Sequence, residues 1–320
     1  MKIKGFLLLI FILSIPSFIR LVRPGIYTTQ DFHYFRLVEF DKCVRDLQIP
    51  CRWAPDAGYG YGEPLFNFYG QAPYFLGEIP HLIGISKIDS LKLLFALSLV
   101  GSSLAMFVFA RRLWKSSLGG FISALVYLYA PYRAVDVWVR GALPEALAFI
   151  LFPLILYFLD RYIDEEREKD LLIFGLLLAL LVVTHNLSAV MFLPIIAAWA
   201  AYKIFILKKK KILPKVIFAG FVSLLLTSFY LLPVIFESSF ITLGETTKGY
   251  FDFQDMETGE SLPFHLDGAT LAQYRLRVRR WYNELQRACA HRGATYARVM
   301  AEWPVEQAVI PYLRRRGVIQ

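Results

Sequence analysis

Residues 171–207 read LLIFGLLLALLVVTHNLSAVMFLPIIAAWAAYKIFIL, two apolar runs that meet at His185 and Asn186. Four consecutive lysines, Lys208 to Lys211, follow the second run directly. A helix needs roughly 20 predominantly apolar residues to cross the hydrocarbon core of a bilayer, and both runs approach or reach this length. The stretch therefore predicts two membrane-spanning helices, joined by a tight turn on one side and followed by a basic cluster on the other.

The chain before and after this stretch repeats the pattern. Hydrophobic residues make up 57% of the 320 residues and charged residues only 19%, whereas a soluble domain is about half apolar and a quarter charged. Five further apolar segments lie at 5–22, 90–110, 117–131, 144–160 and 213–236. We therefore expect an all-α polytopic membrane protein with about seven transmembrane helices. The shorter segment 73–86 is interrupted by Glu78 and His81, which predicts an interfacial or re-entrant helix.

The distribution of basic residues predicts the orientation of the chain. With seven spans, the clusters at 111–115, 161–169 and 208–215 all lie on the same side as the N-terminus, and such clusters are typical of cytoplasmic loops. The sequence thus predicts a multi-pass protein of the cell membrane with a cytoplasmic N-terminus and a long first extracytoplasmic loop, residues 23–89. These clusters explain the formal net charge of +9, which therefore gives no reason to expect a nucleic-acid partner.

Charged side chains gather at the start of the first outer loop. Within two turns of a helix predicted to begin near residue 31 lie Asp31, His33, Arg36 and Glu39. A carboxylate at the membrane surface can act on a substrate, or it can simply complement the positive end of the helix dipole. The local sequence leaves both interpretations open.

Aromatic residues and glycines dominate the next part of this loop. Residues 58–70, GYGYGEPLFNFYG, include Tyr59 and Tyr61 and have little aliphatic bulk. Such a surface can stack on sugar rings or line a groove through which a lipid enters. An ordinary aromatic belt at the membrane interface is the alternative.

A second group of charged residues lies between two predicted spans, in the outer loop at 132–143 and just beyond it. Its members are Arg133, Asp136, Arg140 and Glu145. Guanidinium groups at the interface suit a lipid-linked phosphate, with the acids holding them in place, but arginines that reach the interface beside neighbouring acids give the same pattern. His185 and Asn186 also fall near the outer surface, where they either contact a substrate or cap the turn.

Two of the three cysteines, Cys43 and Cys51, lie in the first outer loop. If this loop faces an oxidising compartment, a disulfide can join them; two free thiols are the alternative. Cys289 has no evident partner.

The order of these features resembles the GT-C class of integral-membrane glycosyltransferases, and most closely its branch of 6-pyruvoyl-tetrahydropterin-synthase-related membrane proteins. The resemblance covers about residues 1–253. It is carried by Asp31-x-His33, Arg36 and Glu39; Trp53, Gly58-Tyr-Gly60 and Pro64; Ala130-Pro-Tyr-Arg133; Val139-Arg-Gly-Ala142 and Glu145; Thr184-His-Asn186; and Lys248-Gly-Tyr-Phe-Asp252.

The resemblance implies transfer of a sugar from a polyprenyl-phosphate donor to an acceptor hydroxyl on the outer face. By position Asp31 matches the catalytic base of the class, with Glu39 and Asp56 as alternative carboxylates. The residues expected to bind the substrate are His33, Arg36, Trp53, Tyr59, Tyr61, Arg133, Arg140, Glu145, His185 and Asn186. Some members use a divalent metal, for which Asp31 and His33 would supply ligands. A non-catalytic protein that binds or transports lipid-linked sugars is the competing interpretation.

The tail, residues 254–320, differs in composition from the rest of the chain. It contains ten Arg and no Lys, whereas residues 1–253 contain 11 Arg and 14 Lys. It resembles the C-terminal end of bacterial proteins of unknown function with a von Willebrand A-like domain, most visibly in Met256-Glu-Thr-Gly-Glu260 and in Trp303-Pro304 to Arg316. We expect a small fused α/β fragment with a helix at 269–291, a strand at 295–299 and a helix at 304–316.

Overall fold

The structure is a computed structural model, and it describes two compact units of the chain. The described residues are 3–25, 32–57, 60–237, 249–254, 261–266 and 310–315, with single positions between 276 and 291. The units are Met1–Phe240 and Ile241–Gln320.

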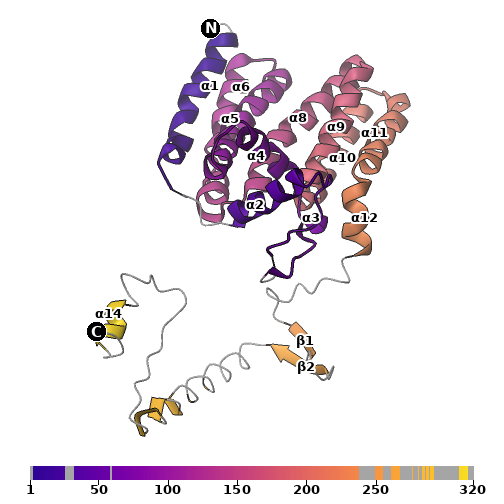
Figure 1. Cartoon of the computed structure of the whole chain (residues 1–320). Helices are drawn as coiled ribbons and strands as arrows, with labels where there is room; N and C mark the ends of the chain where they lie inside the picture. Colours follow the sequence, from indigo (N-terminus) through magenta and orange to yellow (C-terminus); the bar gives the residue numbers. More distant parts are fainter. Residues whose placement is uncertain are drawn as a thin grey trace. The chain divides into compact units, whose positions relative to one another are not determined.

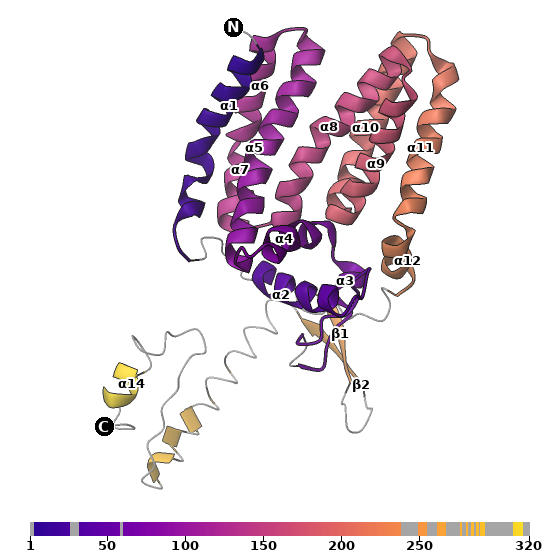
Figure 2. The same cartoon turned by 45° about the horizontal axis from the view of Figure 1, so that its top comes forward.

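The first unit is a bundle of long helices, and α2 (Phe32–Arg45), α3 (Leu65–Phe68) and α4 (Ala72–Leu82) lie at one end of it (Figures 1 and 2). The long helices are α1 (Ile3–Phe18, continued by the 3₁₀ turn Ile19–Val22), α5 (Lys87–Trp114), α6 (Ser117–Leu128), α8 (Leu143–Glu165), α9 (Glu168–Thr184), α10 (Asn186–Ile206) and α11 (Leu213–Leu226). The other shorter elements are α7 (Pro131–Ala134), a π-helical turn (Val135–Arg140), a 3₁₀ turn (Lys210–Ile212) and α12 (Ser228–Phe236).

Helices occupy all seven predicted span positions, but the count of seven spans is not confirmed. Four stretches in the described part are long and apolar enough to cross a membrane: Ile3–Val22, α5, α8 and α10. A fifth forms only if α11 and α12, which are bent by 72° at Thr227, act as one broken span. The predicted span 117–131 ends early, at Leu128, because a residue that precedes a proline, here Ala130 before Pro131, disfavours the helical conformation.

Two large clusters of buried side chains hold the bundle together, and α8 links them; a small third cluster joins α1, α5 and α6. One large cluster joins α2, α4 and α5 to the start of α8, and the other joins the rest of α8 to α9, α10 and α11. Helix α5 begins at Ser86, whose hydroxyl accepts a hydrogen bond from the backbone N–H of Asp89 over 3.1 Å, and it ends at Lys115 in the left-handed conformation. Small residues such as Ser98 and Ser102 let α5 approach its neighbours closely.

Ion pairs bring the predicted basic clusters to one end of the bundle. Arg112 of α5 pairs with Asp160 and Asp164 of α8 over 2.7 Å each. Lys203 of α10 pairs with the same two carboxylates, and Lys209 pairs with Glu166 over 2.8 Å. The clusters therefore lie on one side, as the positive-inside rule requires. The assignment of that side to the cytoplasm stays a prediction.

In the second unit the structure describes a β-hairpin and a short helix. Strand β1 (Gly249–Gln254) pairs antiparallel with β2 (Ser261–Leu266), with Phe251 opposite Phe264. Helix α14 (Ile310–Arg315) lies within the predicted helix 304–316. The sequence analysis did not predict the hairpin, and the boundary expected after Phe253 falls inside β1. The strand expected at 295–299 lies outside the described residues.

Candidate functional site

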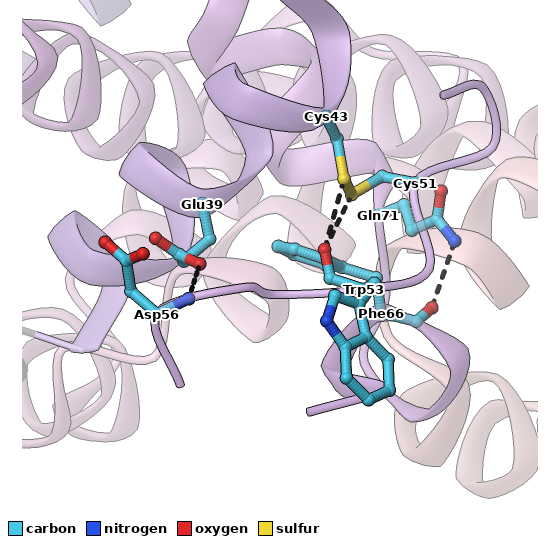
Figure 3. Close-up of a disulfide and its surroundings, with 7 residues drawn as sticks. All are labelled: Glu39, Cys43, Cys51, Trp53, Asp56, Phe66 and Gln71. Carbon is cyan, nitrogen blue, oxygen red and sulfur yellow. Dashed lines mark hydrogen bonds between the residues drawn. A yellow bond between two sulfur atoms is a disulfide. The ribbon is translucent and has the colours of Figure 1, made fainter. Parts of the chain in front are cut away.

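Within the predicted first outer loop, residues 23–89, helices α2, α3 and α4 pack around an aromatic core. The ring of Phe40 lies 5.3 Å from that of Phe66 and 4.6 Å from that of Phe75, both edge to face. A disulfide joins Cys43 at the end of α2 to Cys51 in the segment that follows (Figure 3), so the bridge is present and the free-thiol alternative is not. The core and the bridge fix the loop that leads from α2 toward the predicted aromatic surface.

Glu39 is the internal anchor of this loop. Its side chain is fully buried, and its Oε2 accepts a hydrogen bond from the backbone N–H of Asp56 over 2.8 Å (Figure 3). Its Oε1 accepts from Lys42 Nζ, also over 2.8 Å, and the same ammonium pairs with the Asp56 carboxylate. Both oxygens of Glu39 are thus engaged within the protein, whereas the side chain of Asp56 is 64% exposed.

An open pocket of about 650 Å³ lies between α2 and this loop. Its lining residues are Phe32, Tyr34, Phe35, Arg36, Asp56, Ala57, Glu63 and Leu65. The guanidinium of Arg36 lies 3.8 Å above the ring of Tyr69, and among the described residues it pairs with no carboxylate. The pocket therefore combines a cation, two carboxylates and aromatic walls. Asp31, which directly precedes Phe32 in the sequence, lies outside the described residues.

The predicted aromatic surface begins where a backbone bridge between Ala54 and Glu63 closes the loop tip. Gly62 adopts a positive φ of 81°, and a Cβ at this position would lie 2.4 Å from the indole Nε1 of Trp53. The glycine thus gives the indole room to lie on the backbone, with 46% of Trp53 exposed, while Tyr61 is 90% exposed. Tyr59 lies outside the described residues.

His33 of α2 is buried, and its ring contacts Tyr74 of α4 and the backbone at Gly141. Its Nδ1 lies 2.9 Å from the hydroxyl of Tyr74 in α4, and its Nε2 lies 2.8 Å from the carbonyl oxygen of Gly141. Burial, together with the positive charge of Arg36, lowers the pKa of His33 to about 4, so the imidazole is neutral at pH 7. In this arrangement neither ring nitrogen is free for a metal ion.

The second outer group forms a hydrogen-bonded cluster around Arg140. Its Nη1 donates to the hydroxyl of Tyr132 over 2.9 Å and to Oε2 of Glu145 over 2.8 Å, and it lies 3.5 Å from Oδ1 of Asp136. The hydroxyl of Tyr132 donates to the other oxygen of Glu145. The Arg140 side chain is 46% exposed, so its remaining donors are open to a ligand.

Arg133 and Asp136 lie inside the protein beneath this cluster. Arg133 is only 1% exposed; its guanidinium lies 4.3 Å from the ring of Phe149 and donates to Oγ of Ser102 over 3.2 Å. Asp136 is fully buried, 3.9 Å from Arg133. Burial, together with the negative charge of Glu145, raises the pKa of Asp136 to about 7. The two arginines therefore share one counter-ion but only Arg140 faces outward.

Comparison with known proteins places the chain in a family of membrane proteins. Residues 66–258 match the 6-pyruvoyl-tetrahydropterin synthase related domain, described as a membrane protein. The chain belongs to this family. An uncharacterized protein of Lactococcus lactis subsp. cremoris (strain MG1363) is 23% identical over 244 residues, which cover 72% of this chain and 39% of that protein. The chain thus spans about two fifths of the length of this curated relative. No solved structure matches the chain.

The region matched by the family contains the Arg140 cluster and the turn between α9 and α10. In this turn Nδ1 of His185 lies 2.6 Å from Oγ of Ser188, and both Glu145 and Arg140 act electrostatically on the imidazole. Burial is the main cause that lowers the pKa of His185. Asn186 is half-buried and its Oδ1 accepts from the backbone N–H of Leu187. The fold thus brings His185 within electrostatic reach of Arg140 and Glu145, and all three were expected to bind the substrate.

Gly70 connects the first outer loop to that turn. A Cβ on Gly70 would lie 2.4 Å from the carbonyl oxygen of Thr184, the last residue of α9, so only a glycine fits there. The sequence analysis did not single out Glu63, Leu65 and the aromatic residues Phe32, Tyr34 and Phe35 as pocket residues. The alternation of aromatic and charged residues at the start of α2 is the signal that could have indicated them.

Proposed function

We propose that this protein transfers a sugar from a polyprenyl-phosphate donor to an acceptor hydroxyl, at the pocket that α2 forms with residues 56–57 and 63–65. The observation that carries the proposal is Arg36, a cation without a paired carboxylate among the described residues, in a pocket that also exposes Asp56 and Glu63. A guanidinium held flat on an aromatic ring is well suited to bind a phosphate oxygen. Membership of a membrane-protein family is consistent with a lipid-linked donor.

The chemistry needs one base and one group that stabilises the leaving phosphate. A carboxylate takes the proton from the acceptor hydroxyl, whose oxygen then bonds to the anomeric carbon. The bond from that carbon to the donor phosphate breaks, and the polyprenyl phosphate leaves with the electron pair, stabilised by Arg36. We assign the base to Asp31, which adjoins the pocket residue Phe32 in the sequence. Asp56 is the alternative, and Glu39 positions Asp56 through the hydrogen bond to its backbone.

The other predicted residues support substrate binding in this proposal. Arg140, held by Tyr132 and Glu145, offers a second cation to an anionic group of the donor. The exposed rings of Trp53 and Tyr61 offer faces on which a sugar can stack. Arg133 acts from the interior, where it supports the Arg140 cluster through Asp136.

The competing function is binding or transport of lipid-linked sugars without catalysis. It is favoured by the ion pairs that engage the outer carboxylates described here, since Asp56 pairs with Lys42 and Glu145 pairs with Arg140. Transport needs the cations and the aromatic surface but no base. Substitution of Asp31 separates the two functions.

The test uses membranes that contain the full chain and a radiolabelled polyprenyl-phosphate sugar. We expect Asp31→Asn to lower the rate of transfer about 10²-fold or more while it leaves donor binding nearly intact. We expect Arg36→Ala to weaken donor binding. The exposed Asp46, which is four residues beyond Lys42 in the sequence and has no assigned role, provides the control Asp46→Asn. Unchanged turnover in Asp31→Asn would remove Asp31 from the catalytic role, and donor binding without any transfer by the wild type would favour the transport function.

A further inference from the structure

A second polar cluster lies away from the pocket, where α2, α4 and the start of α5 meet. Its members are Asp41 of α2 and Glu78 and His81 of α4. One ligand atom of each, a carboxylate oxygen or an imidazole nitrogen, lies within 4.8 Å of the other two. Glu78 and His81 are three residues apart on one helix and therefore share a face.

Glu78 is the unusual member of this cluster. It is only 2% exposed, and neither of its carboxylate oxygens has a hydrogen-bond donor. A buried carboxylate without a partner is costly, and native proteins nearly always provide one. Another carboxylate, Asp41, lies within 4.8 Å of it, so the two acids need either a cation or a shared proton between them.

The other two members are oriented as metal ligands commonly are. Nδ1 of His81 donates to the carbonyl oxygen of Ile85 over 2.9 Å, which leaves the lone pair of Nε2 facing the cluster. Oδ1 of Asp41 accepts from Nε of Arg45 over 2.7 Å, which leaves Oδ2 facing the cluster. The protein thus engages Nδ1 of His81 and Oδ1 of Asp41, while Nε2 and Oδ2 face the cluster.

The ammonium of Lys87 shows that the cluster accepts a cation. Lys87 is the first residue of α5, and its Nζ lies 2.8 Å from Oδ2 of Asp41 and 2.8 Å from Nε2 of His81. No hydrogen bond reaches Glu78 from this ammonium. Lys87 therefore satisfies two of the three ligands and leaves the third without a partner.

We propose that Asp41, Glu78 and His81 form a binding site for a divalent transition-metal ion of the zinc type, which displaces the ammonium of Lys87. One imidazole and two carboxylates are ligands that zinc accepts at about 2.0–2.2 Å, whereas magnesium and calcium prefer oxygen ligands alone. The ion would tie α2 to α4 at a place five residues along α2 from Arg36. The site stands independently of the proposed sugar transfer, and its test does not measure transfer.

The test is zinc binding by the purified full chain in detergent, measured by competition with a chromophoric chelator and by metal analysis. We expect Glu78→Gln and His81→Gln to weaken zinc binding at least about tenfold. We expect Lys87→Met to strengthen it, also about tenfold, because the competing ammonium is gone. The control is Asp89→Asn, an exposed carboxylate near the same end of α5, which should leave binding unchanged. Magnesium and calcium should not compete.

Three results would overturn the proposal. One is wild-type protein that binds no zinc beyond what Glu78→Gln binds. Another is a Lys87→Met variant that stays folded, as judged by circular dichroism and gel filtration, but binds zinc no better. The third is a Glu78→Gln variant with higher thermal stability and unchanged zinc binding, which would show that Asp41 and Glu78 share a proton. Because glutamine has the shape of glutamate, Glu78→Gln keeps the test interpretable if His81→Gln fails to fold.

Discussion

Two arginines seven residues apart, Arg133 and Arg140, lie in different surroundings. Arg133 and Arg140 both follow an apolar segment and both precede Glu145, so both were expected to bind the donor. The π-helical turn Val135–Arg140 points them differently, with Arg133 inside against Phe149 and Arg140 at the surface. Removal of one partner of a buried ion pair typically costs about 3–5 kcal/mol, so a loss of donor binding in an Arg133 variant has to be separated from a loss of folding.

The buried carboxyl of Asp136 makes the stability of the protein dependent on pH. Its pKa is about 7 in the folded protein and near 3.8 when unfolded, so its contribution is full below about pH 4 and is lost as the pH rises through 7. The groups that face it are Arg133, Arg140, Glu145 and Tyr132. We expect the unfolding temperature to fall between about pH 4 and pH 7, and Asp136→Asn to reduce this fall. A slope that is identical in both proteins would exclude Asp136 as its source.

At the scale of elements, the contact between Gly70 and the end of α9 couples the first outer loop to the bundle. In Gly70→Ala the new methyl group meets the carbonyl oxygen of Thr184, and we expect a loss of about 1–3 kcal/mol in the free energy of unfolding. Gly220→Ala in α11 is the matched control, because a Cβ there meets nothing within 4 Å. Thermal unfolding in detergent measures both. Equal unfolding temperatures of the two variants would mean that the loop shifts to accept the methyl group without a loss of stability.

Hydropathy predicted the positions of the helices well, because an apolar run needs no partner to be recognised. It failed where tertiary context decides, as in the early end of α6 before Pro131 and in the bend of 72° after α11. The outer loop shows the same limit. Glu39 and Asp56 were both expected as alternative catalytic carboxylates. Only the fold shows that Glu39 is buried and binds the backbone N–H of Asp56. The cluster of Asp41, Glu78 and His81 joins two helices that the sequence analysis did not connect.

At the scale of the whole molecule, the chain divides after Phe240. From the sequence the tail is expected to be a fused fragment, and we predict that it takes no part in the chemistry of the membrane unit. We expect a chain that ends at Phe240 to keep the membrane insertion and the unfolding temperature of the full chain. A chain that ends at Leu226 is the control. It also loses α12, whose Tyr230 hydroxyl donates to the carbonyl of Phe68 in the outer loop, and should be less stable. A large loss on ending at Phe240 would show that the tail is integrated.

The shared ion pairs at the basic end of the bundle have a consequence for biosynthesis. Synthesis proceeds from the N-terminus, so Arg112 is already present when Asp160 and Asp164 leave the ribosome, whereas Lys203 follows about forty residues later. At roughly 5–20 residues per second this delay lasts about 2–8 s. During that interval Arg112 is the partner that can neutralise the two carboxylates of α8. Arg112 of α5 can thus pair with α8 before Lys203 of α10 has been synthesised.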